Sequence, residues 1–101
     1  MSKETAFAAV SRLYQEFLKL PFPPGLAGAD QAGFGLVMLD SDTAAWIFIW
    51  IRNGGALETQ GRSGLLRCIA RLDRVIPILS EPDDPQYWHR FHDMARLVAA
   101  S

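Results

Sequence analysis

The most apolar segment of the chain reads AAWIFIWI and covers residues 44–51. Tryptophan, phenylalanine and isoleucine favour β-strands, because aromatic and branched side chains fit a pleated surface. We therefore predict a strand over residues 44–52. Asn53 and Gly54 follow, and Asn-Gly is the strongest short signal for a hairpin because both residues tolerate positive φ. The segment thus predicts the central strand of an antiparallel sheet.

Two shorter segments extend this sheet. Residues 34–39 read as the preceding strand, and residues 40–43, with the sequence DSDT, read as the turn between the two. Residues 56–60 read as a short third strand after the Asn-Gly turn. The three strands predict an antiparallel meander with residues 44–52 in the middle.

The two ends of the chain predict helices, because apolar residues recur there at spacings of three and four. The first helix covers residues 3–20, with Ser2 as its N-cap and the prolines from position 21 onward ending it. The last covers residues 85–100, with Asp84 as N-cap and Pro85 in the first turn.

A helix also precedes Pro77, beginning at residue 63 or 64 and ending at residue 76. The element order is then α-β-β-β-α-α. This order predicts an α+β fold, in which a three-stranded antiparallel meander packs with three helices in one domain over residues 1–101.

The central strand is apolar on both faces. Strand alternation places Trp46, Phe48 and Trp50 on one face, and the strand before it adds Phe34 and Leu36 to that face. An antiparallel sheet with one solvated face should instead alternate apolar with polar residues. Both faces must therefore be covered, by the three helices alone or by a second copy or another protein on the aromatic face. In the latter case these five residues form the interface.

Arginines mark the helix before Pro77. Arg67, Arg71 and Arg74 are spaced four and three apart, and Arg62 extends the stripe. Such a stripe can meet an acidic partner or an anion, although a solvated face opposite an apolar one has the same pattern. The segment GRSG at 61–64 can bind an anion at the helix start, and Ser63 as a plain N-cap explains it equally well.

Composition narrows the classes of partner. The chain has 101 residues, with 10 Lys plus Arg against 11 Asp plus Glu, and this near-neutral balance argues against nucleic acid. The single cysteine, Cys68, cannot form an intrachain disulfide, which fits a reducing compartment. The eight-residue apolar segment is shorter than the about 20 residues of a membrane span, and the first residues lack a secretion signal. We expect a cytoplasmic protein with no membrane contact.

The candidates for site chemistry are weak. His89 and His92 can share a metal, but a zinc site needs a third and usually a fourth ligand. Asp40 and Asp42 fall in the predicted turn, where aspartate bonds to its own backbone. Cys68 has no histidine near it in sequence to activate it. The sequence predicts no metal, no cofactor and no catalytic residue.

These observations favour a small non-enzymatic protein–protein interaction module of a bacterial cytoplasm. An adaptor, an accessory subunit and an immunity or antitoxin-like protein all have this size. The partner would be a second copy of the chain or another protein, bound through the aromatic sheet face and the arginine stripe. The alternative is a small-ligand binding protein or small enzyme with a pocket under the loop at 21–33, near Tyr14, Trp46 or Trp50.

Overall fold

Helices make up all the regular structure in residues 2–20, 35–79 and 84–101, which are the residues that the computed structural model describes. They are α1 (Lys3–Leu18), α2 (Leu36–Arg52), α3 (Thr59–Val75) and α4 (Pro85–Ala100), with a turn of 3-10 helix, η3 (Ile76–Ile78), after α3. The predicted α+β fold is therefore wrong, since these residues contain no strand and no sheet.

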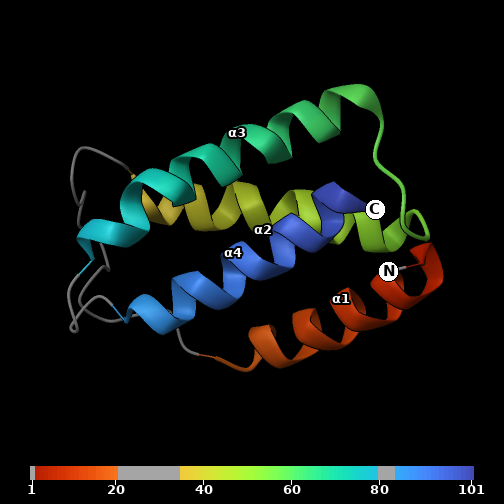
Figure 1. Cartoon of the computed structure of the whole chain (residues 1–101), viewed down its shortest axis with the longest axis horizontal. Helices are drawn as coiled ribbons and strands as arrows, with labels where there is room; N and C mark the ends of the chain where they lie inside the picture. The colour runs from red at the N-terminus through yellow and green to blue at the C-terminus, as the bar shows by residue number, and fades with distance from the viewer. Residues whose placement is uncertain (1, 21–34, 80–83) are drawn as a thin grey trace.

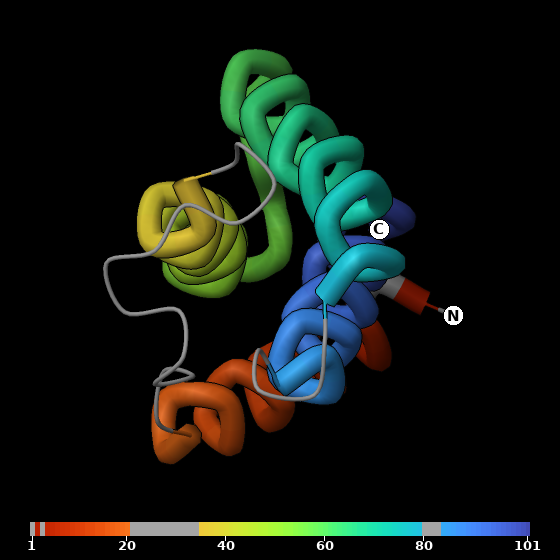
Figure 2. Tube along the Cα trace, turned by 90° about the vertical axis from the view of Figure 1, so that its left-hand side faces the viewer, coloured from red at the N-terminus to blue at the C-terminus, as the bar shows by residue number. Residues whose placement is uncertain are grey.

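Neighbouring helices run antiparallel in the spatial order α2, α3, α4, α1 (Figure 1). The end-on view in Figure 2 places α2 beside α3 and α1 beside α4, and the contact between α1 and α2 is the least extensive among these helix pairs. The core lies where the four helices face one another. Its largest fully buried side chains are Trp50, Trp88, Phe91, Leu36, Leu39, Ile47, Leu65, Leu72, Met94, Val10 and Val75.

The helices at the two ends confirm the sequence predictions. The Ser2 hydroxyl accepts a hydrogen bond of 3.1 Å from the Thr5 N–H and caps α1. The Asp84 carboxylate accepts one of 3.3 Å from the Tyr87 N–H and caps α4, with Pro85 in the first turn. α1 ends at Leu18, two residues earlier than predicted.

Residues 36–52 form one helix, where the sequence pattern predicted two strands and a turn. The buried residues of α2 are Leu36, Leu39, Thr43, Ile47 and Trp50, at spacings of three and four. The predicted turn is a helix interior, in which the Thr43 hydroxyl donates to the Leu39 carbonyl at 2.7 Å. The apolar run at 44–51 satisfies both the strand pattern and the helix pattern, so its periodicity alone did not distinguish a strand from a helix.

The Asn-Gly signal ends a helix instead of turning a hairpin. Gly54 and Gly55 have φ values of 73° and 100°, the left-handed region that glycine adopts without strain. The Gly55 N–H donates to the Trp50 carbonyl and the Gly54 N–H to the Ile51 carbonyl, which together form a Schellman motif. Residues 56–58 then connect to α3 without strand pairing, and the predicted third strand is wrong.

α3 begins at Thr59, about one turn before the predicted start, because the segment GRSG lies inside the helix. Gly61 and Gly64 are buried and face the indole of Trp46 on α2. A Cβ atom on Gly64 would lie 2.6 Å from Trp46 Cε2, far inside a normal contact distance. The two glycines therefore let α2 and α3 approach closely, and they form a seat for Trp46.

Candidate functional site

The predicted interface residues lie on different sides of α2. Leu36 and Trp50 are fully buried in the core, and Trp46 is partly buried against α3. Phe48 is 48% exposed, and Phe34 lies outside the described residues. The prediction that these residues share one face of a sheet is therefore wrong. They lie on a helix, where residues two apart point in directions about 200° apart.

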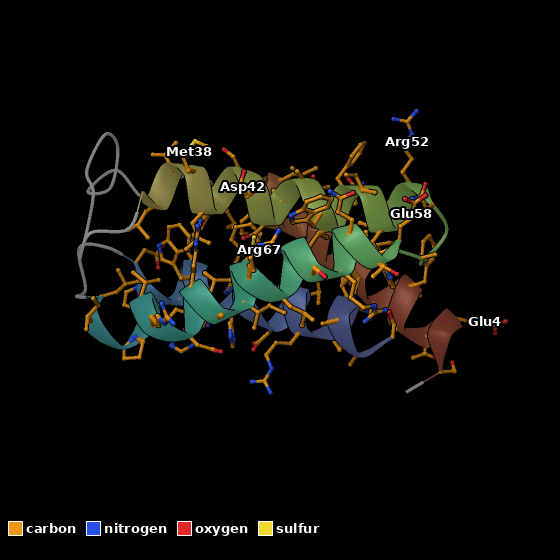
Figure 3. All side chains as sticks on the ribbon, turned by 90° about the horizontal axis from the view of Figure 1, so that it is seen from above. Glu4, Met38, Asp42, Arg52, Glu58 and Arg67 are labelled. Atoms are coloured by element: carbon orange, nitrogen blue, oxygen red, sulfur yellow. The ribbon has the colours of Figure 1, made fainter. Side chains whose placement is uncertain are left out.

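α2 nevertheless has a second apolar face, which points away from the core. Four of its large apolar side chains are exposed: Val37, Met38, Phe48 and Ile49. Ser41, Ala45 and Arg52 are also exposed and complete this outer face at helical spacing. Figure 3 shows Met38 and Arg52 projecting from α2 on the side away from α3. The outer face of α2 is the strongest candidate site in the described residues.

Helix α1 extends this apolar surface on one side. The rings of Phe48 and Tyr14 approach with centroids 6.3 Å apart, so Phe48 bridges α2 and α1. Leu18 lies one turn after Tyr14 on α1 and is 59% exposed. The apolar surface is thus wider than a single helix.

Charged residues border the outer face on the α3 side. Asp42 is half-buried on α2, and Arg67 lies on α3 beside it (Figure 3). Burial raises the pKa of the Cys68 thiol, with a hydrogen bond to Thr43 opposing that rise. Asp42 also raises this pKa, and Arg71 and Arg67 lower it.

The arginine stripe divides into two parts. Arg67, Arg71 and Arg74 are exposed on α3 and form no ion pair within the described residues. Arg62 turns the other way. Its guanidinium donates to the main-chain oxygens of Ala99 at 2.6 Å and Ser101 at 3.0 Å, so it stabilises the negative end of α4. Sequence reasoning missed this role because the partners lie 37 and 39 residues away.

Asp40 lies at the junction of three helices. The Tyr87 hydroxyl on α4 donates to its Oδ2 at 2.5 Å. Burial raises the pKa of Asp40, and the hydrogen bond from Tyr87 partly opposes the rise. The pKa values of Tyr87 and Tyr14 are raised, in both cases first by burial and then by interaction with Asp40. Asp40 and Asp42 face different helices, so the predicted Asp-Ser-Asp turn is wrong.

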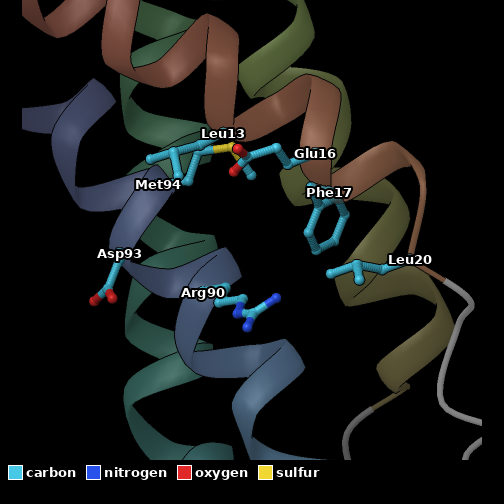
Figure 4. A pocket seen from close by; sticks show the side chains of 7 residues that line it. All are labelled: Leu13, Glu16, Phe17, Leu20, Arg90, Asp93 and Met94. Atoms are coloured by element: carbon cyan, nitrogen blue, oxygen red, sulfur yellow. The ribbon is translucent and has the colours of Figure 1, made fainter.

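A cavity of about 280 Å³ opens between α1 and α4 (Figure 4). A smaller one of about 170 Å³ shares Leu20 and Arg90 with it. Tyr14, Trp46 and Trp50 line neither of these two, and the loop at 21–33 lies outside the described residues. The larger cavity is lined by Leu13, Glu16, Phe17, Leu20, Arg90, Asp93 and Met94.

The two histidines do not form a metal site in the described residues. His92 is partly buried, and its Nε2 lies 2.6 Å from Asp73 Oδ1 on α3, whereas His89 is exposed. No group of three or more His, Cys, Asp or Glu with metal-binding geometry occurs among residues 2–20, 35–79 and 84–101. None of the helices in these ranges is both long enough and apolar enough to cross a membrane.

Comparisons with protein-family models, with curated proteins and with solved structures found no match to this chain. Function is therefore inferred from the helices and side chains described above.

Proposed function

We propose that the protein is a non-enzymatic protein–protein interaction module and that the outer face of α2 is its binding surface. The observation that carries this proposal is the position of four large apolar side chains outside the core. Val37, Met38, Phe48 and Ile49 are exposed, and none of them belongs to the cluster of buried core residues. Within the chain Phe48 contacts the ring of Tyr14, and the rest of its surface remains exposed.

A partner bound on the outer face would bury apolar surface that folding leaves in contact with water. Met38 is 62% exposed and Phe48 is 48% exposed, so about half or more of each residue's surface remains available to a partner. Removing apolar surface from water favours association by about 25 cal/mol per Å², and the loss of translational, rotational and side-chain freedom on binding offsets part of this gain. Contiguous exposed apolar patches on monomeric proteins mark interaction sites more often than single exposed residues do. Clustering on one helix face is therefore the relevant feature.

The charged border supports the same proposal. Protein interfaces combine an apolar centre with a polar rim that remains partly solvated. Arg52 lies at the C-terminal end of the outer face, and Arg67 and Arg71 are exposed on the neighbouring helix α3. These arginines offer donors to acidic groups on the partner.

Photo-crosslinking in the cells that produce the protein tests this proposal. p-Benzoylphenylalanine at Phe48 or Ile49 places a reactive ketone on the outer face. Leu66 on α3 provides the matched control, because it is 50% exposed and Phe48 is 48% exposed. We expect a defined crosslinked protein from positions 48 and 49 and none from position 66.

The masses of the crosslinked products decide the outcome. A discrete adduct from the outer face alone supports the module and also reports the mass of its partner. Equal crosslinking from position 66, or no adduct from positions 48 and 49, would refute the proposal that the outer face of α2 is the binding surface.

A second candidate function is the binding of a small amphipathic ligand between α1 and α4. The cavity of about 280 Å³ there has an apolar lining that includes Phe17 and Met94, with Arg90 at its edge. Ligand sites commonly start at about 300 Å³, so only a small molecule would fit. Met94→Trp fills this cavity. A metabolite that raises the Tm of the wild type but not of this variant would favour this function.

We also propose a cytoplasmic location. The buried Cys68 is a free thiol, and free cysteines are typical of reducing compartments. Fractionation of the host cells followed by detection of the chain would test it, and recovery outside the cytoplasm would contradict it.

A further inference from the structure

We infer that the partner on the outer face of α2 is a second copy of the same chain, bound by antiparallel pairing of the two α2 helices. This inference rests on the proposed function and names its partner. The observation behind it is the order of charges along the face. Asp42 lies toward the N-terminal end of α2 and Arg52 at the C-terminal end, with Ala45, Phe48 and Ile49 between them.

The segment from Asp42 to Arg52 has opposite charges at its two ends, so it is complementary to itself after a two-fold rotation. Asp42 and Arg52 are ten residues apart, which is about 15 Å along a helix. If the two-fold axis passes near residue 47, Arg52 of each copy lies opposite Asp42 of the other. The interaction then occurs twice, as it must in an isologous interface.

The same register places large side chains against small ones. Ile49 of each copy lies opposite Ala45 of the other, because both pairs are symmetric about residue 47. Ala45 and Ser41 are small and exposed, so the two helix axes can approach closely at this point. A parallel pairing would instead bring Asp42 against Asp42 and Arg52 against Arg52, which like-charge repulsion disfavours.

The size of the face predicts a modest affinity. In this register the two α2 helices overlap from residue 42 to residue 52, about 15 Å of helix about 10 Å wide, so α2 alone offers about 150 Å² of projected face. Standard interfaces bury about 800 Å² on each partner, and smaller ones belong to weak or transient complexes. Leu18 and Tyr14 on α1 add to the apolar surface beside Phe48. We therefore expect a concentration-dependent dimer with a Kd in the micromolar range.

Sedimentation velocity on the purified full chain tests the inference, from low micromolar to near-millimolar concentration. The wild type should move from the mass of one chain, 11.2 kDa, toward twice that mass as concentration rises. Asp42→Lys and Arg52→Glu should each raise the Kd at least about tenfold, because each brings two pairs of like charges together. Arg74→Glu on the exposed side of α3 is the matched control and should leave the Kd unchanged.

Mixing the two single variants gives the sharper result. In a mixed dimer the lysine introduced in one copy lies opposite the glutamate introduced in the other. The second pair is the native one, between Asp42 and Arg52, so both interactions are attractive again. We expect the mixture to dimerise where each variant alone does not. Dimerisation of the mixture would also show that both variants are folded, since an unfolded chain could not restore the dimer.

Three outcomes would overturn the inference: a wild type that stays monomeric throughout, a dimer that neither substitution weakens, or a mixture that stays monomeric. If crosslinking from position 48 captures a different protein while the purified chain is monomeric, the interaction module stands and the second copy is refuted. If crosslinking captures nothing and the chain is monomeric, both proposals fail.

Discussion

Replacing Gly64 by alanine tests the contact that fixes α2 on α3. A Cβ at this position would lie 2.6 Å from Cε2 of Trp46 and 2.7 Å from its Cζ2 and Nε1. Carbon atoms in ordinary contact are about 3.5–4.0 Å apart, so the indole must move by roughly 1 Å. Trp46 is partly buried between the two helices and packs against the core, so this movement disturbs its neighbours.

Two opposing effects set the magnitude. Overpacking of a well-packed contact costs about 1–3 kcal/mol. Alanine in place of glycine inside a helix recovers about 1 kcal/mol of backbone propensity. We therefore expect Gly64→Ala to lower the free energy of unfolding by up to about 2 kcal/mol, which corresponds to a fall in Tm of up to about 8–16 °C in a domain of this size. Urea unfolding and thermal melts monitored by circular dichroism measure both quantities.

Two further variants isolate the contact. Ala70→Gly, at an exposed position of α3, measures the propensity difference alone and should cost about 1 kcal/mol. In a Trp46→Phe background, Gly64→Ala should be neutral or stabilising, because the smaller ring leaves room for the Cβ. A rise in Tm for Gly64→Ala in the wild-type chain would refute the seat and the helix spacing that depends on it.

Three other substitutions test single features of the fold. Arg62→Ala removes the donor at the end of α4 and should cost about 1–2 kcal/mol in urea unfolding, whereas exposed Arg67→Ala should change stability by less than about 0.5 kcal/mol. Burial raises the pKa of Asp40 above its ordinary 3.8, so its contribution to stability is present below that pH and is lost as pH rises through the raised value. We therefore expect the difference in unfolding free energy between the wild type and Asp40→Asn to fall as pH rises from 3.8 through the raised pKa. If the two unfolding free energies change in parallel with pH, the burial of Asp40 is contradicted. Gly54→Ala forces a side chain to a φ of 73° and should lower stability by about 1 kcal/mol; an unchanged Tm would show that the Schellman turn rearranges without strain.

The ends of the chain were predictable because their signals are local. Ser2 and Asp84 are side chains that cap the helix beginning next to them, and Pro85 fits the first turn. These features need no information about the rest of the fold. The exact end of α1 was less predictable, since helix ends depend on the packing of the last turn.

The error at α2 has a physical cause in the apolar run at 44–51. Strand alternation is satisfied by any segment in which almost every residue is apolar, so it did not discriminate. The helical spacing was present in the sequence at Leu36, Leu39, Thr43, Ile47 and Trp50, but Thr43 and the aspartates around it resembled a turn. The glycines at 61–64 were also ambiguous. In the sequence they resembled a loop before a helix, whereas in the structure they lie inside α3 and pack against Trp46.

One inference about α2 holds in a different geometry. The sequence indicated an element that is apolar on both sides, and α2 buries Ile47 and Trp50 while it exposes Phe48 and Ile49. Which residues lie on which side depends on the helical period of about 3.6 residues, and a strand period of two assigns them differently. This is why Leu36 and Trp50, which were predicted at an interface, lie in the core. The role of Arg62 was beyond sequence reasoning, since only the folded chain brings Ala99 to it.

The outer face is not explained by stability alone. Met38 is 62% exposed in the native state, so it gains little from folding, whereas Ile49 is 37% exposed and buries more of its surface. Met38→Glu should therefore leave the stability of the monomer within about 0.5 kcal/mol of the wild type, and Ile49→Glu should cost about 1–2 kcal/mol. Ile49→Glu should also abolish association, because it places a charge opposite Ala45 at the centre of the paired segments, whereas Met38 lies outside residues 42–52 and tests the rest of the outer face. A loss of stability as large as that of a core substitution would show instead that the outer face packs within the chain, and the case for a partner would lose its basis.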